Sequence, residues 1–149
     1  MKLRTTTVLA LVIGGLILPA SASHGFDGAA SGLRANESKA VGILRTIGAG
    51  EITHESYHKR FATLAELIEG QYLEKEYFDG SLHDGYQISE VQITDEYFEV
   101  KAEPVTPTSG RYAFNITNDY YIRYTEGQEA PRGQEGTVLK NAPPDKAPN

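Results

Sequence analysis

Residues 39–67 read KAVGILRTIGAGEITHESYHKRFATLAEL, and this stretch decides the fold. Apolar residues recur in it three, four or seven positions apart, which is the spacing of one face of an α-helix. A helix is therefore expected over about residues 37–58, beginning near Asn36 or Ser38, both good capping residues. Its stripe consists of Ala40, Val41, Ile43, Leu44, Ile47, Gly48, Ile52, His54 and Tyr57.

The end of the same stretch predicts a second, short helix. In Thr63-Leu64-Ala65-Glu66 the Thr63 side chain can accept a hydrogen bond from the backbone of Glu66, whose carboxylate can reach back to Thr63. Gly70 can close this helix in a left-handed conformation. Its buried side is expected to consist of Leu64, Leu67 and Ile68.

Alternating apolar and polar residues predict a first β-hairpin. Phe98, Val100 and Ala102 would form the buried face of one strand, and Val91 and Ile93 would supply its partner. The two faces match if Ile93 lies opposite Phe98, which requires a four-residue loop from Thr94 to Tyr97. A β-bulge is expected near Ser89–Glu90, because Tyr86 and Ile88 are out of phase with Val91 and Ile93.

A second hairpin is expected after residues 103–110, which contain two prolines and are interpreted as a crossover loop. Its apolar faces match if Ile116 lies opposite Tyr120, with Thr117, Asn118 and Asp119 as the loop. The predicted fold class is α+β, with two helices packed on an antiparallel sheet of about four strands in two hairpins.

The two ends of the chain differ from its middle. Residues 1–22 resemble a secretory signal peptide: two basic residues, an eleven-residue apolar run and the cleavage signal Ala20-Ser21-Ala22. That run is shorter than the roughly 20 residues that span a bilayer. Residues 23–35 are expected to be a flexible leader, residues 36–126 the domain, and residues 127–149 a disordered tail rich in Gly and Pro. Export to the periplasm or the cell surface is predicted.

Charge and composition limit the function classes. Cleavage after Ala22 removes two of the fourteen basic residues and none of the twenty acidic ones, which leaves a net charge of −8. This balance argues against nucleic-acid partners and anionic membrane surfaces, since both require basic patches. The chain has no cysteine, so disulfides and thiol chemistry are excluded. After cleavage no membrane span is expected, and the expected partners are proteins.

One motif suggests catalysis. His54 and His58 are one helical turn apart with Glu55 after the first, the pattern of zinc peptidases in which two imidazoles bind the metal and the Glu polarises water. Glu74 or Glu76 could be the third ligand. The alternative is that two histidines occupy a partly buried face near a helix end, next to the cations of Lys59-Arg60. We favour this alternative and assign no catalytic, cofactor-binding or metal-binding residue.

Taken together, the pieces resemble the globular domain of short bacterial type IV pilin-like and pseudopilin-like proteins over about residues 36–125. The residues that carry the resemblance are Ala40-Val41, Leu44-Arg45-Thr46-Ile47, Glu51, Tyr57, Phe61-Ala62-Thr63-Leu64-Ala65-Glu66-Leu67, Gly85-Tyr86, Phe98-Glu99-Val100-Lys101-Ala102, Pro104, Pro107, Gly110-Arg111-Tyr112, Phe114 and Ile122-Arg123-Tyr124. The resemblance implies a structural helix-and-sheet domain without metal chemistry. The chain departs from the family at Gly25-Phe26, where Ala30 replaces the Glu of the prepilin site and no apolar helix follows.

The sequence therefore predicts an exported, non-enzymatic, pilin-like structural and interaction protein that is accessory to a pilus or a secretion system. Two alternatives remain open. One is a small zinc metallopeptidase that uses His54, Glu55 and His58, and the other is a periplasmic module that binds a small ligand.

Overall fold

The structure is a computed structural model that describes residues 34–140. The expected signal peptide, residues 23–33 of the leader and residues 141–149 of the tail lie outside the described residues. In chain order the elements are α1 (Ala35–His58), α2 (Leu64–Glu69), β1 (Leu82–His83), β2 (Tyr86–Ile93), β3 (Phe98–Pro104), β4 (Tyr112–Thr117), β5 (Ile122–Glu126) and β6 (Thr137–Val138).

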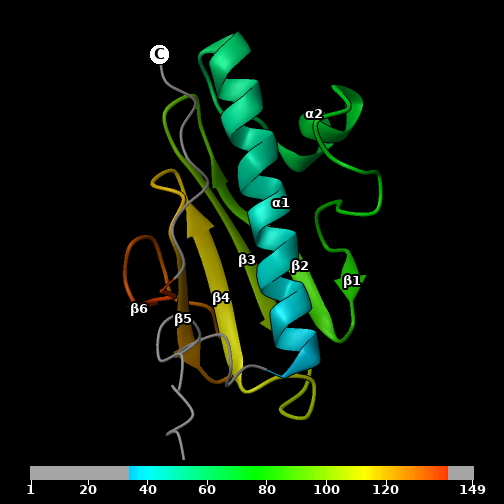
Figure 1. The fold of residues 1–149 in the computed structure, drawn as a ribbon, viewed down its shortest axis with the longest axis vertical. Helices are drawn as coiled ribbons and strands as arrows, with labels where there is room; N and C mark the ends of the chain where they lie inside the picture. Colours follow the sequence, from blue (N-terminus) through cyan, green and yellow to red (C-terminus); the bar gives the residue numbers. More distant parts are fainter. Residues whose placement is uncertain (1–33, 141–149) are drawn as a thin grey trace, which may run out of the picture.

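The strands form one antiparallel sheet in the order β1-β2-β3-β4-β5-β6, so each strand lies beside its neighbours in sequence. Helix α1 runs along one face of this sheet, over β3 and β4 (Figure 1). The α+β class is therefore confirmed, but the sheet has six strands rather than about four. The additional strands, β1 and β6, have two residues each, too few for a periodic pattern. No helix of the described residues is both long and apolar enough to cross a membrane.

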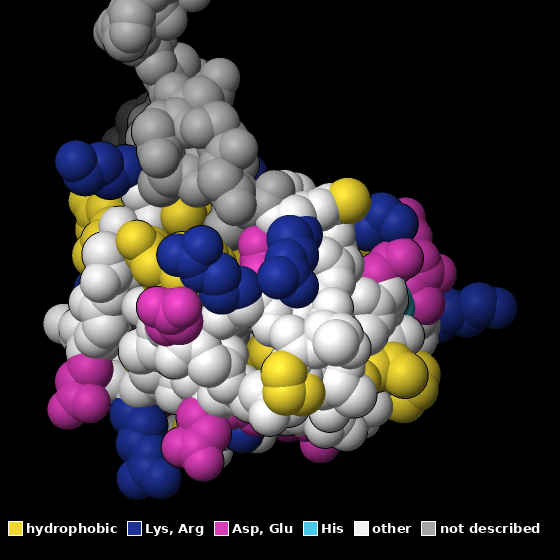
Figure 2. Space-filling view, turned by 90° about the horizontal axis from the view of Figure 1, so that it is seen from below, with side chains coloured by type: hydrophobic (Ala, Val, Ile, Leu, Met, Phe, Trp, Pro, Cys, Tyr) yellow, Lys and Arg dark blue, Asp and Glu magenta, His cyan; other side chains and the backbone are white. Residues whose placement is uncertain are grey.

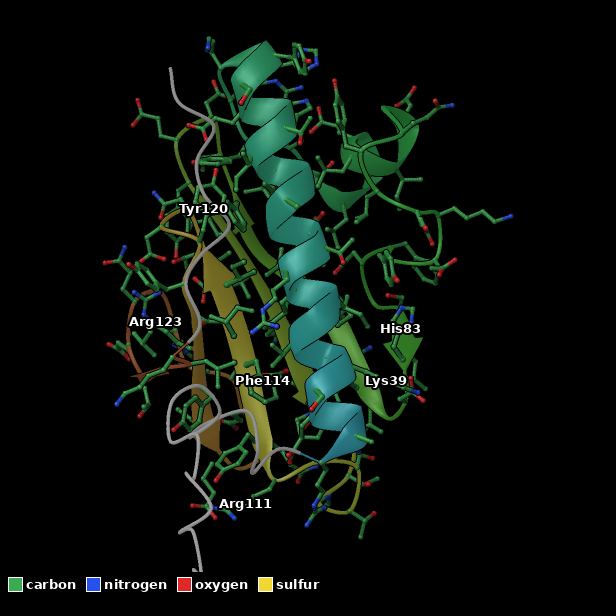
Figure 3. The ribbon with its side chains drawn as sticks, in the orientation of Figure 1. Lys39, His83, Arg111, Phe114, Tyr120 and Arg123 are labelled. Atoms are coloured by element: carbon green, nitrogen blue, oxygen red, sulfur yellow. The ribbon has the colours of Figure 1, made fainter. Side chains whose placement is uncertain are left out.

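The core lies between α1 and the sheet. From the helix, Leu44 and Ile47 are completely buried, and from the sheet Phe98, Val100 and Phe114 are as well. Phe114 projects from β4 toward α1 (Figure 3). Burial of each of these large apolar side chains contributes about 2 kcal/mol to folding. The 3.6-residue period of the helix and the two-residue period of β3 thus predicted the core correctly.

The start of α1 differs from the prediction. The helix begins at Ala35 with Arg34 as its N-cap, so neither Asn36 nor Ser38 caps it. The Glu37 carboxylate takes the capping role: it accepts a hydrogen bond of 2.6 Å from the Arg34 N–H and another of 2.6 Å from the Arg111 N–H. Because Arg111 directly precedes β4, the completely buried Glu37 ties the start of the helix to the sheet.

The end of α1 also corrects the predicted stripe. Tyr57 is 75% exposed, although its spacing places it near the apolar face. The last turn of α1 extends beyond the ends of the strands (Figure 1), and Tyr57 lies on its exposed side. The helix ends at His58, and Lys59 takes the left-handed conformation with φ of 60°.

Helix α2 has the predicted capping box. The Glu66 N–H donates to Thr63 Oγ1 at 3.1 Å, and the Thr63 N–H donates to Glu66 Oε2 at 2.9 Å. Gly70 was predicted to be left-handed, but its φ is −76° and Gln71 makes that turn, with φ of 60°. A Cβ at position 70 would lie 2.6 Å from the ring of Tyr72, so a larger residue there would force that ring to shift.

The first hairpin has the predicted register. Ile93 lies opposite Phe98, which leaves the four-residue loop, and a bulge interrupts the pairing between Glu90 and Gln92, one residue later than expected. The bulge changes the direction of Val91, which is 48% exposed instead of buried beside Phe98. The extra residue of a bulge commonly re-aims a side chain in this way.

The second hairpin differs from the predicted register by two residues. Ile122, not Tyr120, lies opposite Ile116, and residues 118–121 form a four-residue loop. Tyr120 adopts a left-handed conformation with φ of 61°, and its N–H donates to the Thr117 carbonyl at 2.7 Å. This bond closes a turn over residues 117–120, and β5 begins only after it. A shift of two residues preserves the side-chain faces, and the predicted core residues therefore remain buried.

Residues 103–110 are not a crossover loop. Strand β3 continues through Pro104, which lies opposite Tyr86, and the following residues join β3 to its direct neighbour β4. Pro104 is tolerated because it is the last residue of the strand, where the ladder no longer needs its N–H.

The tail also differs from the expectation over residues 127–140. Thr137 and Val138 pair with β5, and Leu139 is only 2% exposed. Gly127, Gly133 and Gly136 have positive φ values, so this segment turns repeatedly and forms single contacts instead of a periodic face. Hydropathy periodicity cannot detect such packing.

Candidate functional site

The two motif histidines lie at the end of α1. His54 is 5% exposed, and its Nδ1 lies 3.0 Å from the carbonyl oxygen of Arg60, to which it donates. The ring of His54 stacks on that of His58, with centroids 4.3 Å apart and planes 29° apart. His58 Nε2 lies 3.2 Å from the hydroxyl of Tyr72. One nitrogen of each ring is therefore occupied by a contact within the protein.

Glu55, the expected water-polarising residue, is bound elsewhere. Its Oε2 accepts a hydrogen bond of 2.8 Å from the hydroxyl of Tyr120, which is 3% exposed (Figure 3). Burial raises the pKa of the Tyr120 hydroxyl above its usual value, and the hydrogen bond to Glu55 raises it further. Glu55 thus connects α1 to the loop between β4 and β5.

The third ligand that the motif would need is not brought to the histidines. Glu74 and Glu76 lie in the connection after α2, and the backbone carbonyl of Glu76 contacts His83 at 3.1 Å. Within residues 34–140, no three His, Asp or Glu side chains lie close enough together to hold a metal ion.

We expect Tyr120→Phe to lower the free energy of unfolding by about 1 kcal/mol, because it removes the hydroxyl that donates to Glu55. Urea denaturation would measure the change. The matched control is Tyr57→Phe, whose ring is 75% exposed and which should change stability by less than about 0.5 kcal/mol. Equal stabilities of the two variants would contradict a structural role for the Glu55 contact.

Glu51 is a buried carboxyl group that the sequence analysis did not identify as a candidate site residue. It is completely buried one turn before Glu55. Its Oε2 accepts a hydrogen bond of 3.1 Å from the Ala62 N–H, while its Oε1 has no partner. Burial raises the pKa of Glu51 to about 8 despite the Ala62 hydrogen bond, and the nearby Glu90 carboxylate adds to the shift. The sequence contained one signal for this burial: a charged residue on the apolar stripe of the helix, four positions after Ile47.

Glu66 lies near Glu51 but titrates at the opposite extreme. The Arg60 guanidinium donates to it at 2.7 Å, and this contact lowers the pKa of Glu66 to about 2. Two carboxyl groups with separated pKa values are typical of acid–base sites. However, Glu51 has no exposed surface, so no substrate can reach it. This pair therefore does not form an active site in the described structure.

The other candidate is a cavity on the face of the sheet opposite α1. Its volume is about 650 Å³. Strands β2 and β3 contribute its floor, and the segment that follows β5 contributes its wall. Its lining residues are Val91, Gln92, Glu99, Lys101, Glu103, Glu129, Ala130, Pro131 and Arg132. None of them belongs to the motif that the sequence suggested, because they come together only through the packing of residues 127–140.

Two buried or half-buried carboxylates hold the wall in place. Glu99 Oε1 accepts hydrogen bonds from the Gly133 N–H at 2.8 Å and from Asn115 Nδ2 at 3.1 Å. Glu103 accepts one of 2.9 Å from the Ala130 N–H and forms an ion pair of 2.8 Å with Lys101. The wall is thereby fixed to β3 at two points.

Charges are mixed at the end of the molecule where α1 begins. Figure 2 shows acidic and basic side chains interspersed there, with hydrophobic side chains in small separate groups. Among the described residues visible in this view, there is neither a broad basic patch nor a broad apolar one.

The protein is thus an α+β domain with a polar network at the end of α1. It also has a charged cavity on the face of the sheet that α1 does not cover. Comparison of the chain with known protein families, curated proteins and solved structures found no match.

Proposed function

We propose that this chain is an exported, non-enzymatic, pilin-like protein that acts through contacts with other proteins, as an accessory of a pilus or a secretion system. The observation that carries the proposal is the packing of α1. This helix of 24 residues buries one face against β3 and β4 of an antiparallel sheet. A long helix on an antiparallel sheet is the arrangement that the resemblance to pilins implies.

The contacts of the histidine motif support the non-enzymatic part of the proposal. Glu55 binds Tyr120, and the ring of His54 stacks on that of His58. The motif residues thus join α1 to the segments that surround its end. Their role in this proposal is structural.

Fractionation of the native host with an antibody against this chain tests the proposal. Sheared surface filaments, membranes, periplasm and medium would be compared, and a photo-crosslinking residue at exposed Tyr57 would identify neighbours. We expect specific crosslinks to pilus or secretion components. Recovery only as free protein, with no crosslinked neighbour, would refute the proposed role.

The zinc peptidase alternative has its own test. We expect chain purified without chelators to contain far less than one zinc per molecule and to cleave no peptides, because its Glu55 is bound to Tyr120. Metal analysis and a peptide-cleavage assay would be run on the native chain and on His54→Ala and His58→Ala. Stoichiometric zinc that both substitutions remove, together with peptide cleavage that they abolish, would establish the peptidase.

Small-ligand binding is a second candidate function, favoured by the cavity of about 650 Å³. Typical ligand pockets occupy roughly 300–1,000 Å³. A ligand that binds only the folded state would raise the melting temperature. Thermal shifts with a library of small metabolites would test this function without assuming the ligand's chemistry.

A further inference from the structure

The cavity on the outer face of the sheet carries unpaired charges of both signs. Arg132 and Glu129 are exposed on its wall, and within residues 34–140 neither side chain takes part in an ion pair. Lys101, on the floor, is paired with Glu103 at 2.8 Å, which leaves further N–H donors of its ammonium group for a ligand.

The bulge in β2 adds an apolar surface to the same cavity. Outward positions of β2 before the bulge are polar, Gln87 and Ser89. The bulge places Val91 on the cavity lining, where it is 48% exposed. Pro131, on the wall, is a second apolar lining residue. A ligand with an apolar part would cover the exposed surface of Val91.

The wall is held in place without a ligand. Ala130 and Gly133 donate their N–H groups to Glu103 and Glu99, on either side of Pro131 and Arg132. Both acceptors are carboxylates, and hydrogen bonds to charged acceptors are the stronger kind. A pre-formed wall reduces the conformational entropy that a ligand must overcome on binding.

We propose that this cavity binds a small zwitterion: an α-amino acid with an apolar side chain, free or as part of a short peptide. Its carboxylate would pair with Arg132 and Lys101, its ammonium group with Glu129, and its side chain would lie against Val91 and Pro131. The proposal rests on the second candidate function, small-ligand binding, and names the class of ligand.

The pairing of both exposed charges, Arg132 and Glu129, favours a zwitterion over a simple ion. The charged lining residues are Glu99, Glu103, Glu129, Lys101 and Arg132, and their formal sum is −1. A simple anion would increase this excess, and a simple cation would leave Arg132 without a partner. A zwitterion matches both Arg132 and Glu129 and leaves the sum unchanged.

Calorimetric titration of the full chain with leucine tests the proposal. N-acetyl-leucine lacks the ammonium charge, leucinamide lacks the carboxylate, and trileucine separates the two charges. We expect leucine or trileucine to bind, and each single-charge analogue to bind at least about tenfold more weakly, as expected for the loss of a charge-assisted contact. Tighter binding of leucine would indicate a free amino acid, and tighter binding of trileucine a peptide.

Matched variants locate the site. Arg132→Gln and Glu129→Gln should each weaken binding by about tenfold. Lys75→Gln and Glu69→Gln remove exposed charges outside the cavity and should leave binding unchanged. The proposal is overturned if neither zwitterion binds at about 10 mM, ten times a weak dissociation constant of about 1 mM. It is also overturned if the analogues bind equally well, or if Arg132→Gln and Glu129→Gln have no effect. If the thermal-shift library then showed binding of a different class of ligand, the small-ligand binding function would be supported and only the zwitterion would be rejected as its ligand.

Discussion

Gly110→Ala should destabilise the domain by about 3 kcal/mol or more, a large effect for a single methyl group. A Cβ at position 110 would lie 1.7 Å from the hydroxyl oxygen of Tyr86 and 2.5 Å from its Cζ. Tyr86 cannot move aside easily, because its ring is completely buried and its hydroxyl donates to the Tyr112 carbonyl at 2.6 Å. The backbone next to Gly110 is held as well, since the Arg111 N–H donates to Glu37.

Chemical denaturation of Gly110→Ala, compared with Gly42→Ala, measures this effect. A Cβ at position 42 would meet nothing within 4 Å, so this control should gain up to about 1 kcal/mol from better helix propensity. Tyr86→Ala should remove most of the additional cost of Gly110→Ala in a double-mutant cycle, because it removes the colliding ring. Additive effects of the two substitutions would show that the clash is not the cause.

The period of apolar residues predicted those parts of the fold in which a whole face is buried. Ile93 was placed opposite Phe98 because only that register matches two faces. The hairpin at residues 118–121 was displaced by two residues because both registers bury the same faces. The choice between them depends on the left-handed backbone of Tyr120, for which sequence periodicity contains no signal.

Contacts between distant segments could not be predicted in this way. Glu37 and Glu51 are completely buried, and their carboxylates accept hydrogen bonds from the N–H groups of Arg111 and Ala62, which lie far from them in sequence or in another segment. The cavity joins Val91 of β2 to residues 129–132, which follow β5 in the chain. Its wall belongs to a segment whose composition indicated disorder, and which is fixed by single hydrogen bonds to Glu99 and Glu103.

Glu51→Gln should stabilise the domain increasingly as the pH rises from about 4.5 to about 8. The pKa of Glu51 is about 8 in the folded protein and has its ordinary value of 4.5 in the unfolded chain. Below pH 4.5 the Glu51 carboxyl group is protonated in both the folded and the unfolded state, and its contribution to stability is fully present. Between the two values only the folded state holds it, so the free energy of unfolding falls by about 1.4 kcal/mol per pH unit. Above pH 8 the loss is complete, on the order of 5 kcal/mol.

Glutamine imitates the protonated carboxyl group, because its oxygen can still accept from the Ala62 N–H and it has no charge to lose. Its amide NH2 occupies the place of the unpartnered Oε1, and any cost of burying it is the same at every pH. The pH slope of the stability difference is therefore the measurement, from urea denaturation between about pH 4 and pH 9. The matched control is Glu69→Gln, which removes a carboxylate from the exposed surface.

Glu66→Gln should change the pH dependence of stability in the opposite direction to Glu51→Gln. Since Arg60 lowers the pKa of Glu66 to about 2, its contribution to stability is present above pH 4.5 and lost as the pH falls toward 2. The Glu66 variant should therefore be destabilised at neutral pH, where the Glu51 variant is stabilised. If the stability difference of Glu51→Gln stays constant from pH 4.5 to 8, Glu51 is ionised in the folded protein. The conclusion that Glu51 is buried as an uncharged carboxyl group, between α1 and the segment before α2, would then be wrong.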